Sequence, residues 1–97
     1  MHARLTLIQG SPDQVDAGVE MARSQVLPTL QGCAGYKGFT AGVDRSSGTI
    51  FGLSFFDSAD TLRASDDVIR ATREETAGVA GGSPEVSFYE IVIDDER

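Results

Sequence analysis

Two charged residues lie inside runs that are otherwise apolar. Arg4 stands in the middle of a predicted strand over residues 3–8, and Glu90 stands within the alternating segment 85–93. A guanidinium in that position can hold an anionic intermediate, or it can form a cross-strand ion pair with Glu90. The register of the two strands decides between the functional and the structural pair. A charge that is buried without a partner would favour function.

The sole imidazole and the sole thiol lack the neighbours that catalysis requires. His2 is in principle able to act as a base, but we expect it to be a solvated terminal residue. Cys33 has no histidine or other base near it in the sequence, so we interpret it as a packing thiol. One Cys and one His cannot complete a zinc site of nitrogen and sulfur ligands, so we expect no metal and no internal disulfide.

The glycine-rich segment 77–83 lacks the context of a phosphate-binding loop. Such loops follow a strand and open a helix, whereas this segment lies before a predicted strand. We interpret it as a flexible flap.

Composition predicts one compact domain over residues 1–97. Of these 97 residues 40% are hydrophobic and 24% are charged, which is typical of a globular chain with a single core. The formal charge of −7 repels phosphate backbones and anionic lipids, so we expect neither a nucleic-acid partner nor a membrane partner. The longest apolar runs are strand-sized and no leader opens the chain, which predicts a cytoplasmic location.

The first helix has both a start signal and an apolar stripe. Ser11 is the predicted N-cap, with Pro12 at the first helical position and Gln14 closing a capping box. Pro28 lacks an amide donor, so the last turn should be bent or terminal. The stripe that packs on a sheet consists of Val15, Val19, Ala22, Val26 and Leu30.

The second half of the chain predicts a hairpin, a helix and a strand. Residues 36–43 and 49–56 are strands joined by a polar turn, and Ser58 caps a helix over residues 59–76. The apolar face of this helix is predicted to comprise Leu62, Val68 and Ile69. Its solvated stripe is predicted to comprise Arg63, Asp66, Arg70 and Glu74.

This βαββαβ order predicts an α+β, ferredoxin-like fold with two helices on one face of a four-stranded antiparallel sheet. The other face would remain uncovered. Alternation places there Ile50 and Phe56, together with either Tyr89, Ile91 and Ile93 or Phe88 and Val92. Such a face is too apolar for a solvated monomer, so we expect a homodimer in which a second sheet covers it.

The chain resembles the antibiotic biosynthesis monooxygenase-like domains of the dimeric α+β barrel superfamily. The resemblance covers nearly the whole chain and rests on the segments 27–30, 34–39, 55–58 and 87–93. It implies a homodimer with face-to-face sheets. It also implies an oxygenase that works without metal or flavin, on a small apolar substrate of aromatic or polyketide-like character.

That chemistry requires an apolar pocket and a group that stabilises an enolate. The candidate substrate-binding residues are Arg4, Tyr36, Phe39, Phe56, Tyr89 and Glu90. For the aromatic members the alternative is ordinary core packing, which is the more common role of Phe in a strand. An enclosed cavity would favour ligand chemistry, and a filled core would favour packing.

Two departures separate the chain from its relatives. Phe56 stands where many similar proteins have a Trp linked with substrate binding, and this chain contains no Trp. Haem-degrading relatives use a helix histidine, and residues 59–76 contain none. Two functions therefore remain open: a cofactor-independent monooxygenase or related oxidoreductase, and a non-catalytic dimeric module that binds a small molecule or another protein.

Overall fold

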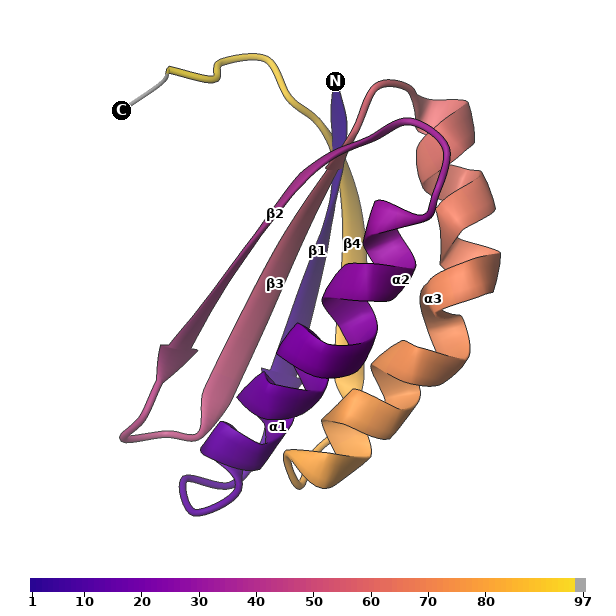
Figure 1. Cartoon of the computed structure of the whole chain (residues 1–97). Coiled ribbons are helices and arrows are strands. Elements are labelled where there is room, and N and C mark those ends of the chain that lie inside the picture. Colours follow the sequence, from indigo (N-terminus) through magenta and orange to yellow (C-terminus); the bar gives the residue numbers. More distant parts are fainter. Residues whose placement is uncertain (96–97) are drawn as a thin grey trace.

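The computed structural model describes residues 1–95 as a four-stranded antiparallel sheet with helices on one face (Figure 1). The strands are β1 (His2–Gln9), β2 (Tyr36–Asp44), β3 (Thr49–Phe56) and β4 (Pro84–Glu90), in the order β2-β3-β1-β4. The helical layer consists of α1 (Val15–Met21), η1 (Ala22–Val26), α2 (Leu27–Gln31) and α3 (Ala59–Val79). The predicted ferredoxin-like α+β fold is confirmed. The sheet of this single chain is open and does not close into a barrel.

The helices α1, η1 and α2 follow one another between β1 and β2, and we call them together the helical rod. The middle segment of the rod, η1, is π-helical. At its end the Leu27 amide donates to the Ala22 carbonyl, five residues back. Hydroxyl groups also compete for the backbone, because Ser24 Oγ donates to the Glu20 carbonyl at 2.8 Å and Thr29 Oγ1 to the Gln25 carbonyl at 2.7 Å. Pro28 removes one further donor in the first turn of α2. Together these features widen the middle of the rod.

The first helix begins later than Ser11, so the predicted capping box there is wrong. Gln14 occupies the N-cap of α1 without a side-chain hydrogen bond. Ser11 Oγ bonds to Asp13 instead, and the Ser11 amide donates to the Ala80 carbonyl at 2.9 Å. Gln14 Nε2 reaches the Val79 carbonyl at 3.4 Å. The loop is held by the end of α3, and this tertiary contact replaces the local cap.

Helix α3 begins where the sequence predicts. Ser58 caps it and forms a capping box with Thr61. One face prediction is wrong, because Val68 is 57% exposed. The buried row of α3 is Leu62, Ser65, Ile69, Thr76 and Ala77, and Val68 lies beside that row.

The strand faces are the reverse of the expectation for β3. Ile50 and Phe56 lie under the helices at 4% and 0% exposure, so their predicted place on the uncovered face is wrong. The register pairs Leu5 with Leu53, which puts the alternate set on the open face. That set, which we call the open face, is Leu5, Leu7, Phe51, Leu53 and Phe55.

The last strand is shorter than predicted, because β4 ends at Glu90. The Ile91 amide still donates to the Met1 carbonyl at 2.9 Å, but Val92 and Ile93 beyond it are 81% and 86% exposed. The glycine-rich connection before β4 is a hydrogen-bonded turn, in which the Gly82 amide donates to the Ala77 carbonyl at 2.9 Å. Ala80 within it is fully buried, so the interpretation of a flap is wrong. In the described part of the chain, no helix is long and apolar enough to cross a membrane.

Candidate functional site

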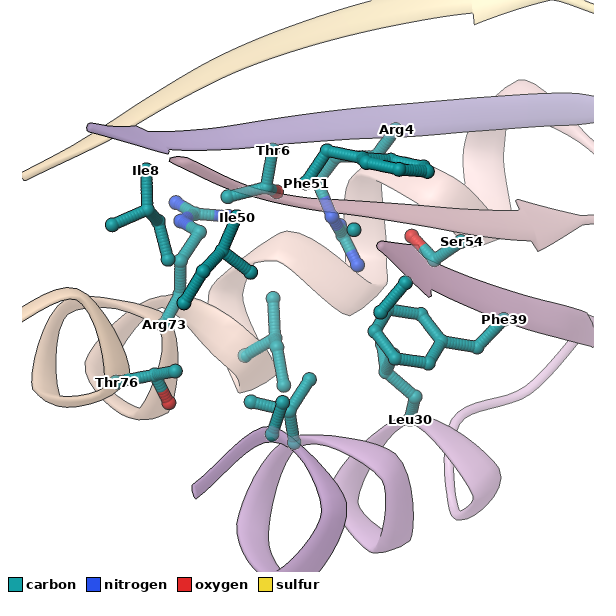
Figure 2. A pocket seen from close by; sticks show the side chains of 15 residues that line it. Arg4, Thr6, Ile8, Leu30, Phe39, Ile50, Phe51, Ser54, Arg73 and Thr76 are labelled. Atoms are coloured by element: carbon teal, nitrogen blue, oxygen red, sulfur yellow. The ribbon is translucent and has the colours of Figure 1, made fainter. Parts of the chain in front are cut away.

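A cavity of about 50 Å³ lies between the helical layer and the sheet (Figure 2). The widened rod supplies Ala22, Val26 and Leu30 to its wall, and β2 and β3 supply Phe39 and Ile50 among others. A π-helical segment is often found at a functional site, and η1 lines this one. We call this space the inner cavity.

An outer hollow of about 220 Å³ continues from the inner cavity toward the edge strand β2. The two spaces share Ala22, Phe39, Ala41 and Ile50 as lining residues. The outer hollow is also bordered by Arg23, which is exposed. The outer hollow therefore adjoins the inner cavity on the side where the helices face β2.

Polar groups enter the inner cavity from both layers. Arg4 extends from β1 toward the helices, and Arg73 extends from α3 toward the sheet (Figure 2). The hydroxyl side chains of the wall belong to Thr6, Ser54 and Thr76. In the described chain no carboxylate and no imidazole lines this space.

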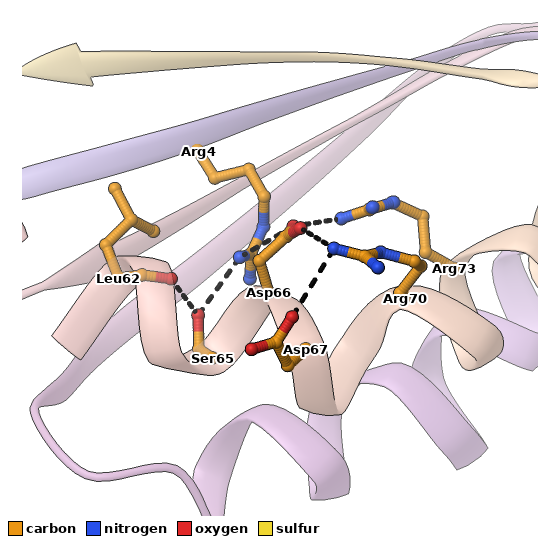
Figure 3. Close-up of polar contacts among 7 residues, drawn as sticks. All are labelled: Arg4, Leu62, Ser65, Asp66, Asp67, Arg70 and Arg73. Carbon is orange, nitrogen blue, oxygen red and sulfur yellow. Dashed lines mark hydrogen bonds and ion pairs between the residues drawn. The ribbon is translucent and has the colours of Figure 1, made fainter. Parts of the chain in front are cut away.

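Arg4 is held in place by polar residues of α3 (Figure 3). Its side chain is 3% exposed, and Nη1 donates to Ser65 Oγ at 3.0 Å and lies 3.6 Å from Asp66 Oδ1. The guanidinium also lies 5.8 Å from the centre of the Phe56 ring, a cation–π contact. Burial lowers the pKa of Arg4, while Asp66 acts in the opposite direction. The predicted mid-strand charge is therefore buried and fixed.

Asp66 connects the arginines of the site. Arg73 Nη1 donates to Asp66 Oδ1 at 2.6 Å, and Arg70 Nη2 donates to Asp66 Oδ2 at 3.2 Å. Burial acts to raise the pKa of Asp66, but the hydrogen bonds from Arg73 and Arg70 outweigh it, so the pKa lies below its ordinary value. The Nε atom of Arg73 is buried, and no described residue accepts a hydrogen bond from it.

The six predicted site residues fall into three groups. Arg4 and Phe39 line the inner cavity. Phe56 and Tyr36 pack beside it with ring centres 6.1 Å apart at 76°, and burial raises the pKa of Tyr36. Tyr89 and Glu90 are exposed on β4 and border a separate hollow against α3.

The predicted ion pair between Arg4 and Glu90 does not form. Arg4 lies opposite Phe88 in the register, whereas Glu90 lies opposite His2. The carboxylate partner of Arg4 is Asp66, which we expected on a solvated stripe; that expectation is wrong, since the side chain is 18% exposed. Ser65 and Arg73 are not among the predicted site residues. Their signal was helical spacing, because both fall on the inward face with Leu62 and Ile69.

The two remaining candidates have structural surroundings. Cys33 is half-buried, packs against the cluster around Phe56, and donates through Sγ to the Thr29 carbonyl at 3.4 Å. His2 is half-buried at the start of β1, so the expectation of a solvated residue is wrong. Its Nδ1 atom is buried without a partner in the described chain.

Solved structures share this architecture over nearly the whole chain. A monooxygenase from Streptomyces coelicolor, ActVA-Orf6, solved in complex with nanaomycin D, matches 99% of this chain and 91% of its own at a TM-score of 0.80 and 16% identity. A proposed antibiotic biosynthesis monooxygenase from Caulobacter crescentus matches 95% and 90% at a TM-score of 0.74 and 14% identity. The chain has the fold of the antibiotic biosynthesis monooxygenases. At these identities the likeness shows the fold and leaves the activity open.

The sequence relatives are longer proteins without an assigned role. Rv2557 of Mycobacterium tuberculosis is 35% identical over 91 residues, which is 94% of this chain and 41% of the relative. Rv2558 of the same organism is 32% identical over 93 residues, 96% of this chain and 39% of the relative. Both are described as uncharacterized. The chain thus spans about two fifths of their length, and no family model matches it.

Proposed function

We propose that this domain is a cofactor-independent monooxygenase acting on a small, apolar, aromatic or polyketide-like molecule. The observation that carries the proposal is the inner cavity, which is apolar over most of its wall and has polar groups at defined points. The shared fold with the monooxygenase from Streptomyces coelicolor supports it.

The proposed reaction oxidises an activated CH₂ group of the substrate. Loss of a proton to water gives an enolate whose carbon reacts with O₂. One oxygen atom becomes a ketone oxygen, and the other leaves as water with the two hydrogens of the CH₂ group. The substrate supplies all the electrons, so the balance requires neither a metal nor a reductant.

Arg4 has the most direct role in this proposal. Its guanidinium is positively charged, buried and held by Ser65 and Asp66, so it is preorganised for a developing negative charge on an enolate oxygen. Phe39 and Leu30 border the same space and would contact the ring system. Phe56 is fully buried and its ring lies 5.8 Å from the Arg4 guanidinium, so we assign it a positioning role.

Oxygen uptake with a panel of anthrone-like phenols tests this function. We expect uptake of one O₂ per substrate, and we expect Ala22→Phe to reduce it at least about tenfold, because Ala22 borders both the inner cavity and the outer hollow. Ala17→Phe, on the exposed side of α1, is the control and should keep wild-type activity. Circular dichroism establishes that both variants fold. No uptake with any substrate, or equal uptake by both variants, would contradict the proposal.

A non-catalytic binding module is the second candidate. The observation that favours it is the cavity wall itself, where the described residues offer no carboxylate or imidazole as a general base. Ligand binding that raises the melting temperature without any oxygen uptake would identify this function.

We also propose that the domain forms a homodimer through the open face. Leu5 and Leu53 lie opposite each other at its centre, and Phe51 and Phe55 flank them along β3. The five residues of the open face carry no charge, although the whole chain carries −7, and the register puts Glu85 and Asp44 at the margins of the face, opposite Leu7 and Thr49. A second copy can therefore approach this side without strong repulsion, and an isologous pairing would cover both faces at once.

A further inference from the structure

The charges that line the inner cavity have a single sign. Arg4 and Arg73 are its ionisable residues, and the described chain contributes no acidic side chain to the wall. The chain as a whole has 15 acidic and 8 basic residues. The cavity is therefore a positive region inside an acidic protein.

Asp66 compensates this charge only in part, and from outside the cavity. Its Oδ1 atom is shared by Arg4 at 3.6 Å and Arg73 at 2.6 Å, while Oδ2 is bound by the exposed Arg70. Asp66 borders a different hollow, which is lined by residues of α3 and β4. Two buried guanidinium groups thus share one carboxylate oxygen. Buried charge that is not fully paired is costly, which favours a further anion on the cavity side.

Hydrogen-bond donors remain available at the same place. Each guanidinium carries several N–H donors and no acceptor. Arg73 Nε is buried without an acceptor in the described chain, and the whole Arg73 side chain is only 11% exposed. An oxyanion beside this atom would satisfy it.

The sizes of the inner cavity and the outer hollow indicate how a ligand would be oriented. The inner cavity of about 50 Å³ suits a small polar group, whereas the outer hollow of about 220 Å³ is larger and borders Val19, Leu27 and Phe39. A ligand with a charged head and an apolar body would place the head at the arginines and the body toward β2.

We propose that the ligand of this cavity is an aromatic carboxylate, with its carboxylate at Arg73, whose Nε lacks an acceptor in the described chain, and its ring toward the outer hollow. This inference rests on the proposed function only in taking the cavity as the ligand site. It adds that recognition depends on a negative charge that the ligand carries before any reaction.

Calorimetric titration with a matched pair of probes, 2-naphthoate and 2-naphthamide, tests the charge. The two probes have nearly the same shape, so a difference in affinity reports on the carboxylate. We expect the acid to bind at least about tenfold more tightly than the amide, because charge-assisted hydrogen bonds are the stronger kind. Arg73→Gln should remove this preference, and Arg73→Lys should retain part of it.

Arg70→Gln is the matched control. Arg70 lies on the same helix and also binds Asp66, but it is 58% exposed and does not line the cavity. This variant should keep the preference for the acid. Circular dichroism reports on the folding of each variant, and if Arg73→Gln does not fold, the acid and amide contrast in the wild type and in Arg73→Lys decides.

The outcomes separate this inference from the proposed function. Preference for the acid that depends on Arg73 supports it, whether or not oxygen is consumed. Equal binding of acid and amide, equal losses in Arg70→Gln and Arg73→Gln, or no binding of either probe would overturn it. If neutral phenols still support oxygen uptake in those cases, the proposed monooxygenase function is retained and only the proposed carboxylate ligand is rejected.

Discussion

Asp66 forms ion pairs with three arginines of the site, Arg4, Arg70 and Arg73. Its folded pKa lies below the ordinary value of 3.8, so its ion pairs are fully formed well above that pH and are lost as the pH falls through the folded value. We expect Asp66→Asn to lower the free energy of unfolding by about 2–3 kcal/mol at pH 7, because Arg4 and Arg73 lose their shared carboxylate. The difference from wild type should shrink as the pH falls below 3.8.

Urea unfolding at pH 7 and at pH 3 measures this difference. Asp67→Asn is the control, since Asp67 is 81% exposed and binds only Arg70 in the described chain. It should change stability by less than about 0.5 kcal/mol at either pH. An Asp66→Asn effect that stays constant from pH 7 to pH 3 would contradict the ion-pair account.

The aromatic residues of the sheet include buried and exposed members, and Phe56 is the buried one that we compare with the exposed Phe88. It is fully buried in the cluster with Leu30, Leu62 and Ile69. Phe56→Ala should cost about 3–5 kcal/mol of unfolding free energy, because it leaves a cavity and removes the cation–π contact with Arg4. Phe88→Ala, at a position 52% exposed, should cost less than about 1 kcal/mol. Thermal unfolding compares the two variants, and similar losses would contradict the assigned faces.

The contact between α1, the end of α3 and the sheet depends on Gly18. A Cβ atom at this position would lie 2.7 Å from Ala80 Cβ and 2.9 Å from Ile50 Cδ1. Gly18→Ala should therefore destabilise the fold by about 1–3 kcal/mol, although alanine favours a helix. Gly78→Ala is the matched control in α3, where an added Cβ meets nothing within 4 Å, and it should stabilise by about 0.5–1 kcal/mol. Chemical denaturation measures both, and a gain at Gly18 would refute the close approach.

The elements that could be predicted from the sequence are those whose stabilising interactions are local along the chain. The Ser58 cap and the stripe of the first helix are local patterns, and both appear in the structure. The Ser11 cap fails because the partner of that loop is Ala80, far along the chain. Long-range contacts of this kind leave no periodic signal in one sequence.

The site was predictable only in part for a related reason. Arg4 stood out because it is a charge in a strand, and the structure places it in the cavity wall. Asp66 and Arg73 are charged residues in a helix, where charges usually form a solvated face, so their inward position depended on the burial of Arg4. A buried charge on one element thus predicts opposite charge on the element that covers it.

At the scale of the whole molecule, the proposed homodimer depends on the open face. Leu53 lies at the middle of β3, between Leu5 on β1 and Thr40 on β2. In a two-fold pairing of sheets the central positions of the two copies lie near each other. Leu53→Glu would bring two like charges together in an apolar interface, while in a separate chain the new side chain would point to solvent.

Light scattering at micromolar concentration measures the result. We expect wild type to have about twice the chain mass of 10.3 kDa. Leu53→Glu should have the mass of one chain and retain its circular dichroism spectrum. Val68→Glu, at a position of α3 that is 57% exposed and lies away from the open face, should remain dimeric. A monomeric wild type would contradict the proposed homodimer. A dimeric Leu53→Glu variant would show that the dimer interface is not the open face.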